Sequence, residues 1–282
     1  MNLKEQAATW LKSVISAHVG ANIRRYKWST YTGEISHNML GGVNYLSPAE
    51  GKVVEQDEQF TLIKSGPSSF CVVATEHLSA PVAVGDKVEV KFYKLRRFDG
   101  TAADGSDDPS DRGSRTIMLT GAETFFPAKW QGRYLAINDR FSDAYTEIGN
   151  PYLRDMIEQM EKLRVDGGMR RVVNVLVDAG ATNLNFIDPK ESDSALIAPA
   201  ITAEVKTAKF QGTVMLGYDR ASDTYFIDLS AGPEQEPRRI EDVHFNEVGE
   251  HLIDAIDDRA WLKAKVTVLK KAPKKKATPE LP

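Results

Sequence analysis

Residues 51–93 constrain the fold of this chain more than any other segment, because apolar and polar residues alternate along them in four short runs. Each run is rich in β-branched or aromatic residues, and turn-forming residues separate one run from the next. The runs are centred on residues 53–54, 60–63, 70–73 and 88–92. Alternation with a period of two predicts strands, and the short spacing predicts antiparallel neighbours. We therefore expect a meander of strands that closes into a small antiparallel β barrel.

The surrounding sequence extends this barrel into a first domain of residues 1–145. Residues 2–19 carry apolar side chains at helical spacing and are followed by Gly20, which is typical of a helix C-terminus. They predict an N-terminal helix that covers a sheet. Residues 99–115 contain Gly, Ser, Asp and one Pro but no apolar residue larger than Ala. This composition predicts a mobile loop within the first domain.

Residues 146–269 predict a second domain in which helices cover a mixed β sheet. Their apolar spacing changes from helical to alternating and back to helical. The expected helices are 151–163, 169–179 and 246–257, and the expected strands include 184–187, 201–207, 212–218 and 224–229. The predicted fold class is therefore α+β. Residues 270–282 contain five lysines and little apolar surface, so they predict a disordered basic tail.

The composition restricts the partners of this chain. Its 282 residues carry a formal net charge of -4, so only a local basic patch could attract nucleic acid or an anionic membrane. Cys71 is the single cysteine, which excludes an internal disulfide and agrees with a reducing compartment. The first residues lack the features of a signal peptide, and no segment approaches 18 apolar residues. We expect a cytoplasmic protein that makes no membrane contact.

A local basic patch is present in residues 22–31, where cationic and aromatic side chains alternate. Arg24, Arg25 and Lys27 are suited to phosphate binding. Tyr26 and Trp28 are suited to stacking on bases, so all five are candidate nucleic-acid-binding residues. The same stretch also fits a strand in which Tyr26 and Trp28 face a core. The sequence leaves both interpretations open.

The lysines near the C-terminus are the second candidate contact with nucleic acid. They are Lys274, Lys275 and Lys276. A basic arm of this kind binds phosphate weakly and without sequence preference. A solvated terminus explains the same residues equally well.

No set of residues for catalysis, a cofactor or a metal stands out in the sequence. The five histidines form no HxxxH or HxH pair, and one cysteine cannot supply CxxC. GxSxG, phosphate-loop and dinucleotide motifs are also missing from the sequence. Turn chemistry explains the carboxylates expected at the ends of elements, which are Asp178, Asp188, Asp219 and Asp223. We therefore predict a protein that is not an enzyme and that needs no cofactor or metal.

Several short motifs occur within residues 51–93. They are Gly51-Lys52-Val53, Lys64-x-Gly66, Leu78, Pro81, Val84-Gly85-Asp86 and Phe92-Tyr93. In these motifs the segment resembles the KfrB-type domain that accessory proteins of conjugative plasmids carry. The resemblance implies an accessory role on a plasmid or another mobile element. It supplies no catalytic residues.

The sequence thus predicts a non-enzymatic binding or regulatory accessory protein of a mobile element, either a plasmid or a phage. Its expected partner is nucleic acid or a machine that processes nucleic acid, met through a face of the barrel. The alternative is an inhibitor or adaptor that acts on a host protein by protein–protein contact. An enzyme acting on nucleic acid ranks third. The sequence leaves the oligomeric state open.

Overall fold

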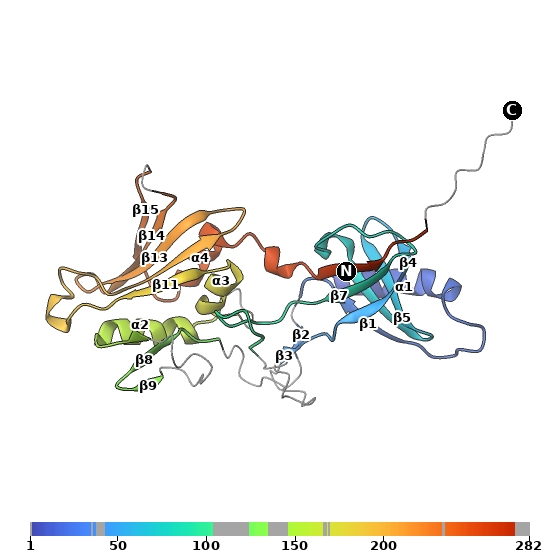
Figure 1. Cartoon of the computed structure of the whole chain (residues 1–282), viewed down its shortest axis with the longest axis horizontal. Coiled ribbons are helices and arrows are strands. Elements are labelled where there is room, and N and C mark those ends of the chain that lie inside the picture. Colours follow the sequence, from blue (N-terminus) through green and yellow to red (C-terminus); the bar gives the residue numbers. More distant parts are fainter. Residues whose placement is uncertain are drawn as a thin grey trace. The chain divides into compact units, whose positions relative to one another are not determined.

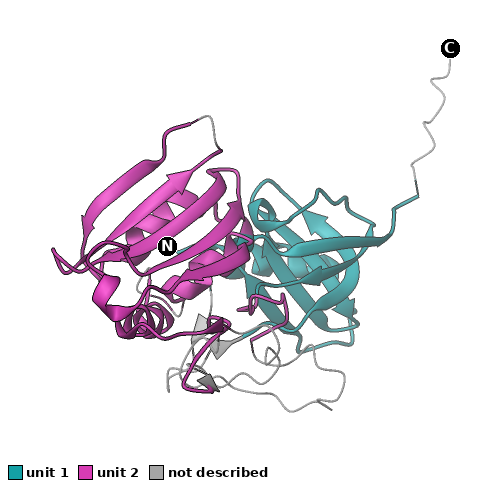
Figure 2. Ribbon diagram, turned by 60° about the vertical axis from the view of Figure 1, so that its left-hand side comes forward, with its two compact units in different colours: residues 1–36, 44–93, 261–282 teal, residues 37–43, 94–260 magenta. Residues whose placement is uncertain are grey.

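The computed structural model describes residues 2–34, 36–37, 43–103, 124–134, 146–165, 168, 170–232 and 235–273 (Figure 1). Helices and mostly antiparallel sheets make the chain an α+β protein, as the sequence predicts. The chain divides into two compact units (Figure 2). Unit 1 comprises Met1–Ser36, Asn44–Tyr93 and Trp261–Pro282, and unit 2 comprises His37–Val43 and Lys94–Ala260.

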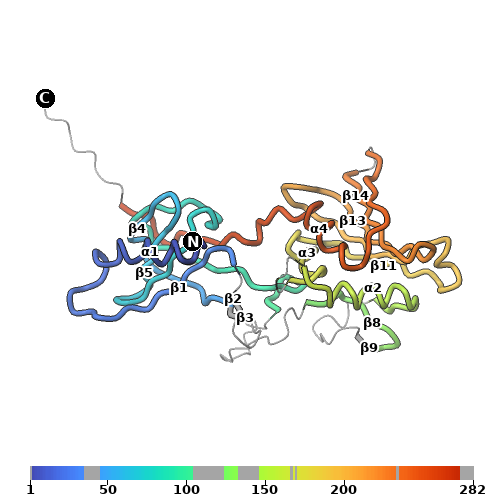
Figure 3. The backbone as a smooth tube through the Cα atoms, turned by 180° about the vertical axis from the view of Figure 1, so that it is seen from behind, coloured from blue at the N-terminus to red at the C-terminus, as the bar shows by residue number. Residues whose placement is uncertain are grey.

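These limits differ from the predicted domain boundaries at residues 145 and 269. Phe126 and Ala128, which precede the predicted boundary, pack in the core of unit 2. The C-terminal strand returns to unit 1, where it pairs with the strand Lys87–Lys91. Figure 3 follows this path from the blue N-terminal helix to the red C-terminal strand within one unit. Because the two paired strands are distant in the sequence, no local pattern of residues predicts their pairing.

A six-stranded sheet with the order β1-β6-β5-β4-β7-β16 forms unit 1. Its strands are β1 (Lys27–Tyr31), β4 (Ala49–Gln56), β5 (Phe60–Gly66), β6 (Ser69–Ala74), β7 (Lys87–Lys91) and β16 (Lys265–Lys270). β1 runs parallel to β6, and the other neighbours are antiparallel. The turns after β4 and β5 fall where the sequence predicts them, near residues 57 and 67.

Two apolar clusters lie on opposite faces of this sheet, because side chains alternate along each strand. Ile63 belongs to one cluster and its neighbour Leu62 to the other, so β5 is buried on both faces. The predicted N-terminal helix is α1 (Leu3–Val14), and its residues Ala7 and Leu11 pack in the same cluster as Leu62. Asn2 begins the helix with a capping box that includes Glu5.

The sheet is not closed into the predicted barrel. β1 and β16 are its two end strands, and within the described ranges they do not pair with each other. The predicted meander also fails at its last step, because β7 pairs with β4 and not with β6. Residues 75–86, which begin with the short helix η2 (Thr75–His77), carry the chain across to the far side of β4. β16 then takes the remaining edge of β7, where a barrel would place β1.

A tyrosine side chain links the end strand β1 to the segment that precedes β16. Tyr31, the last residue of β1, donates its hydroxyl hydrogen to the carbonyl oxygen of Leu262 at 2.7 Å. Its ring lies 5.0 Å from that of Phe92. Burial raises the pKa of Tyr31 to about 12, so the hydroxyl stays protonated and can donate at any physiological pH. Leu262 lies three residues before β16, so the bond connects β1 to the segment leading into that strand without pairing the two strands.

Gly51, one of the glycines in the motifs of residues 51–93, lies where β4 and β5 approach each other closely. A Cβ atom at this position would collide with the backbone of Lys64 and Ser65 on β5. β4 and β5 also shift register in this region, between Val53 and Glu55. Glycine is therefore required here for close approach of two strands, and the structure gives it no other role.

The first residues of the predicted disordered tail are ordered. Lys270 is the last residue of β16. Two residues later, the backbone N–H of Ala272 donates to Oδ1 of Asp86 at 2.7 Å, and Ala83 donates to Oδ2 of the same carboxylate at 3.0 Å. These two bonds hold the pKa of Asp86 below its ordinary value. Residues 274–282 lie outside the described ranges.

Unit 2 contains a five-stranded sheet with the order β11-β12-β13-β14-β15. Its strands are β11 (Thr182–Ile187), β12 (Ala200–Lys206), β13 (Gln211–Asp219), β14 (Thr224–Ser230) and β15 (Arg238–Val243). The prediction of a mixed sheet is wrong here, because all four pairings are antiparallel. Each connection joins sequential neighbours directly, so none provides the crossover that parallel neighbours require.

Three helices pack their apolar stripes into the core of unit 2. They are α2 (Pro151–Lys162), α3 (Val172–Asp178) and α4 (Val248–Ile256). Their buried residues share one cluster with inward-facing residues of the sheet, as Met160, Leu176 and Leu252 do with Val214 and Ile227. The sequence predicts these helices because each has an apolar stripe at helical spacing.

Short strands complete the described structure. β8 (Ala128–Trp130) pairs with β9 (Arg133–Tyr134) and, in parallel, with β10 (Thr146–Glu147). β2 (Ser36–His37) forms a two-stranded sheet with β3 (Val43–Asn44). Of the loop predicted at residues 99–115, only residues 99–103 are described, and there Asp99 accepts hydrogen bonds from Thr101. The rest of that prediction falls outside the described residues.

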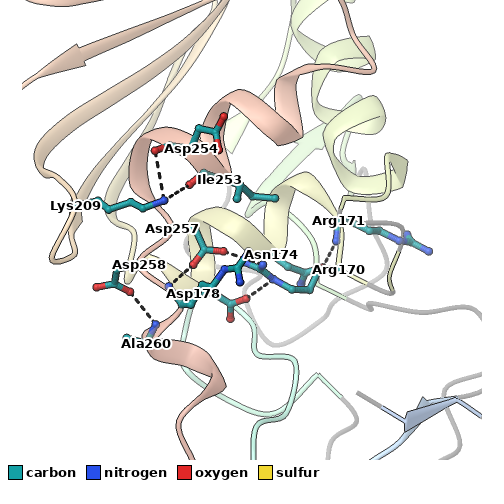
Figure 4. A network of polar contacts seen from close by, with 11 residues as sticks. Arg170, Arg171, Asn174, Asp178, Lys209, Ile253, Asp254, Asp257, Asp258 and Ala260 are labelled. Carbon is teal, nitrogen blue, oxygen red and sulfur yellow. Dashed lines mark hydrogen bonds and ion pairs between the residues drawn. The ribbon is translucent and has the colours of Figure 1, made fainter. Parts of the chain in front are cut away.

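A buried ion-pair network ties α3 to α4 (Figure 4). Nε of Arg170 lies 2.9 Å from Oδ2 of Asp178, and its Nη1 lies 2.8 Å from Oδ2 of Asp257. All three side chains are at least nine-tenths buried. Removing Arg170 would leave two buried carboxylates without their cation, and breaking a buried ion pair in this way typically costs about 3–5 kcal/mol. Asp178, which the sequence assigns to turn chemistry, is therefore part of the core.

Glu161 is a further buried acidic residue, located near the C-terminus of α2. Its Oε1 accepts the backbone N–H of Phe126 at 2.8 Å, and its own side chain is buried. Burial raises the pKa of Glu161 to about 8, while the bond from Phe126 acts in the opposite direction. The folded protein therefore binds a proton at this carboxyl near neutral pH, whereas the unfolded chain does not.

We expect the free energy of unfolding to fall as pH rises from about 4.5 to about 8, because the folded state binds the extra proton throughout this interval. Glu161→Gln should remove most of this slope and stabilise the protein at pH 8 by about 2–4 kcal/mol. Denaturant unfolding at several pH values measures the free energy of unfolding and its slope against pH. Glu191→Gln, at an exposed site of the same unit that does not contribute to the pKa of Glu161, is the control. An unchanged slope in Glu161→Gln would show that Glu161 titrates normally.

Candidate nucleic-acid interface

The five candidate residues Arg24, Arg25, Tyr26, Lys27 and Trp28 lie where the chain enters the six-stranded sheet. Residues 21–26 form the connection that follows α1 and the short helix η1 (Ile15–Ala17), and β1 begins at Lys27. The sequence-based alternative of a strand through the whole stretch is therefore correct only from Lys27 onward. The basic residues Arg24 and Arg25 belong to the connection.

The three cationic side chains of this segment are exposed and carry no ion pair. Arg24, Arg25 and Lys27 are all exposed. Throughout the described ranges, no carboxylate forms a salt bridge with any of them. Their charges are consequently available to an external anion, which is the property that a phosphate-binding patch needs.

The two aromatic side chains of the segment differ in their surroundings. The ring of Tyr26 meets the ring of Phe70 edge to face at a centroid distance of 6.1 Å and packs beside the α1 cluster. Trp28 remains 39% exposed, which is high for a tryptophan. Tyr26 thus fits the interpretation of a packing residue, and Trp28 fits that of a contact residue.

β1 forms an edge of the sheet, and one side of its backbone faces away from the other strands. Its only strand partner among the described residues is β6. The N–H of Lys27 donates to Ser68, on the β6 side, so the backbone groups of Trp28 and Thr30 point to the open edge. The hydroxyl oxygen of Thr30 is also buried without a partner in the described structure. This edge therefore offers unsatisfied polar groups beside the exposed Trp28.

A pocket of about 330 Å³ runs along this edge. Its lining residues are Lys4, Trp28, Ser29, Thr30, Tyr31, Glu34, Tyr45, Leu46, Phe92 and Tyr93. Besides Trp28, four of these ten residues are aromatic. A planar ring that entered the pocket would therefore contact mainly the faces and edges of aromatic rings. One cation and one carboxylate, Lys4 and Glu34, balance each other. The cationic character of the surface therefore comes from Arg24, Arg25 and Lys27.

The pattern of residues 24–28 identifies Trp28, but no local pattern identifies the aromatic residues that share its pocket. Tyr45, Phe92 and Tyr93 come from segments far from β1 in the sequence. Phe92 and Tyr93 follow β7, where apolar residues are expected for packing alone. The second predicted contact, Lys274, Lys275 and Lys276, lies outside the described residues.

The described residues contain no arrangement that suggests metal binding or nucleophilic catalysis. No group of three or more His, Cys, Asp and Glu side chains gathers in the described part of the chain. Cys71 is buried in the sheet, and burial raises the pKa of its thiol to about 11, which makes it a poor nucleophile. Among the helices of the described ranges, none has the length and apolarity to cross a membrane.

Comparisons with known proteins leave this site to be interpreted from its own geometry. No family model matches the chain, and no curated protein or solved structure matches it.

Proposed function

We propose that this chain is a non-enzymatic binding protein that contacts nucleic acid through Arg24, Arg25, Lys27 and Trp28. The observation that supports it is that three exposed cations, none of them ion-paired in the described structure, directly precede an exposed tryptophan at a sheet edge. Such a set combines phosphate binding with base stacking, which is the usual mode of recognising single strands without sequence preference. Because the whole chain is acidic, only a local patch of this kind supports the proposal.

The biological setting belongs to the proposal as well. The resemblance of residues 51–93 to the KfrB-type domain supports an accessory or regulatory role for a mobile element, in the cytoplasm, beside a nucleic-acid-processing machine. In this setting Lys274, Lys275 and Lys276 would add weak phosphate contacts.

Binding to a single-stranded oligonucleotide should weaken steeply as salt rises from about 50 to 200 mM, because each phosphate contact releases counterions. The combined change Arg24→Ala, Arg25→Ala and Lys27→Ala should reduce the slope of log affinity against log salt by roughly 0.7 for each phosphate that is no longer neutralised. Trp28→Ala should cost about 1–3 kcal/mol with little change in that slope. Fluorescence anisotropy at several salt concentrations measures both quantities.

The control replaces three exposed cations of unit 2 with alanine: Lys190, Lys206 and Arg238. It changes the net charge by the same amount and should leave the slope as it is in the wild type. If both triple variants reduce the slope equally, the attraction is a property of overall charge. If neither does, residues 24–28 do not bind nucleic acid.

The open edge of β1 favours a second candidate function, an inhibitor or adaptor that contacts a host protein. Outward-facing backbone groups at Trp28 and Thr30, beside an aromatic pocket, suit an extended peptide that adds a strand to the sheet. This mode uses backbone hydrogen bonds and does not depend on the cations of residues 24–27.

Capture from a host lysate with and without nuclease distinguishes the two functions. Direct binding to nucleic acid predicts that no partner remains after nuclease treatment. The adaptor function predicts that one protein is retained, and that hydrogen exchange at the amides of Trp28 and Thr30 slows in its complex, since these amides would then donate to the added strand. Retention of a protein without such slowing would exclude the β1 edge as its binding site.

A further inference from the structure

The five-stranded sheet of unit 2 carries apolar side chains on the face opposite its core. Met215 and Phe226 alternate with core residues along β13 and β14, so they point to this outer face, where both are only partly buried. A Cβ atom at Gly217 would collide with the ring of Phe226, so the ring lies directly over the glycine of the neighbouring strand. The middle of the outer face is therefore an apolar surface.

The loop before β12 holds two further apolar side chains in solvent. Leu196 is 92% exposed and Ile197 is 53% exposed, although both residue types are usually buried. Hydrogen bonds order the loop: the buried Ser194 accepts the side-chain amide of Asn150 at 2.8 Å, and the N–H groups of Leu196 and Ile197 donate to the carbonyl of Asp193 at 2.9 Å. The exposure of the two side chains is thus a property of a folded loop.

These apolar side chains line one pocket of about 510 Å³, which we call the outer pocket. Leu196 and Ile197 lie on its loop side, and Met215 and Phe226 lie on its sheet side. Exposed apolar residues that gather in one place and are rimmed by polar groups mark sites of protein–protein contact. The volume is sufficient for apolar side chains of a partner.

Three carboxylates of the outer pocket carry unpaired negative charge. Asp219, Glu241 and Asp242 line the pocket and are exposed, and none of them forms a salt bridge with another described residue. Asp219 accepts the backbone N–H of Ala221 at 2.8 Å, which leaves its negative charge in place.

A β-bulge brings two of these carboxylates next to the apolar surface. The register of β14 and β15 shifts so that Glu241 and Asp242 both lie opposite Phe226. Asp242 has a backbone φ of 56°, a left-handed conformation that redirects the strand at this point. Negative charge and apolar surface therefore occur together in one pocket.

The cation of the outer pocket is already bound within the protein. Arg239 is the one lysine or arginine among the described residues that line it. Its guanidinium donates two hydrogen bonds to the carboxylate of Asp228, at 2.7 and 2.6 Å, and lies 4.4 Å from the ring centre of Phe226. The remaining charge of the pocket is negative, so it attracts basic groups and repels acidic ones.

We propose that the outer pocket is a docking site for a partner protein, and that it binds a segment whose apolar side chains lie beside lysine or arginine. The apolar side chains of the partner cover Leu196, Ile197 and Met215, which removes exposed apolar surface from water. Its basic side chains pair with Glu241 and Asp242 and give the contact its specificity. The proposal is independent of the contacts proposed for unit 1.

Three short peptides probe the outer pocket in the full-length protein. A peptide of alternating leucine and lysine should bind saturably and shift the methyl signals of Leu196 and Ile197 in NMR spectra. Matched peptides with glutamate in place of lysine, or serine in place of leucine, should bind at least roughly tenfold more weakly. Equal binding of the glutamate or the serine peptide would overturn the proposal, as would binding that leaves both methyl signals unmoved.

Two double variants separate the apolar contribution from the charge. Leu196→Ser with Ile197→Ser should weaken binding of the leucine–lysine peptide roughly tenfold, and the fold should persist because both side chains are exposed. Glu241→Gln with Asp242→Asn should weaken binding roughly three- to tenfold, and asparagine tolerates the left-handed conformation at residue 242.

The control is Val84→Ser with Leu269→Ser, which removes two exposed aliphatic side chains from unit 1 and should leave peptide binding as in the wild type. Unchanged binding in both outer-pocket variants would contradict the proposal. So would self-association of the wild type in analytical ultracentrifugation that Leu196→Ser with Ile197→Ser abolishes, because a second copy of the chain would then be the occupant.

Discussion

The pairing of β16 with β7 is the interaction on which unit 1 depends, because it brings the last described strand of the chain into the sheet formed by the N-terminal part. Three further bonds support it. Ala264 donates to the carbonyl of His77, Ala272 donates to Asp86, and Tyr31 donates to Leu262. Without β16, strand β7 would become an edge with unpaired backbone groups. The sheet of unit 1 is therefore completed by a strand that follows the whole segment Lys94–Ala260 of unit 2 in the sequence.

The same pairing determines which surface of unit 1 remains open. β16 covers the edge of β7, so the opposite end of the sheet, β1, is left as the edge next to the pocket of Trp28. The loop before β1 places Arg24 and Arg25 at the start of this edge. A closed barrel would have paired the outward-facing backbone of β1 and left no such groove. The open topology thus leaves the edge of β1 available for the proposed addition of a peptide strand.

Local patterns predicted most elements correctly, and long-range pairing is what they missed. The alternation in residues 60–63 and the helical stripe of α2 each reflect the surroundings of neighbouring residues, so the sequence alone was sufficient for them. The open sheet, the return of β16 and the ion pairs of Arg170 depend on partners distant in the chain. At the candidate site, the alternation of cationic and aromatic residues from Arg24 to Trp28 is visible in the sequence. The rings of Tyr45 and Phe92 come close to Trp28 only when the chain folds, so the sequence does not indicate them. The role of residues 24–28 stays a prediction.

Hydrogen exchange in Thr267→Pro tests most directly whether β16 completes unit 1. The N–H of Val266 donates to Ser79, so the N–H of Thr267 points toward β7, and proline at this position removes that ladder bond. The amides of β7 and β4 should then exchange at least roughly tenfold faster, while the sheet of unit 2 keeps its protection. Thr267→Ala, at the same exposed position, should leave both unchanged. Equal protection of β7 in Thr267→Pro and the wild type would contradict the account.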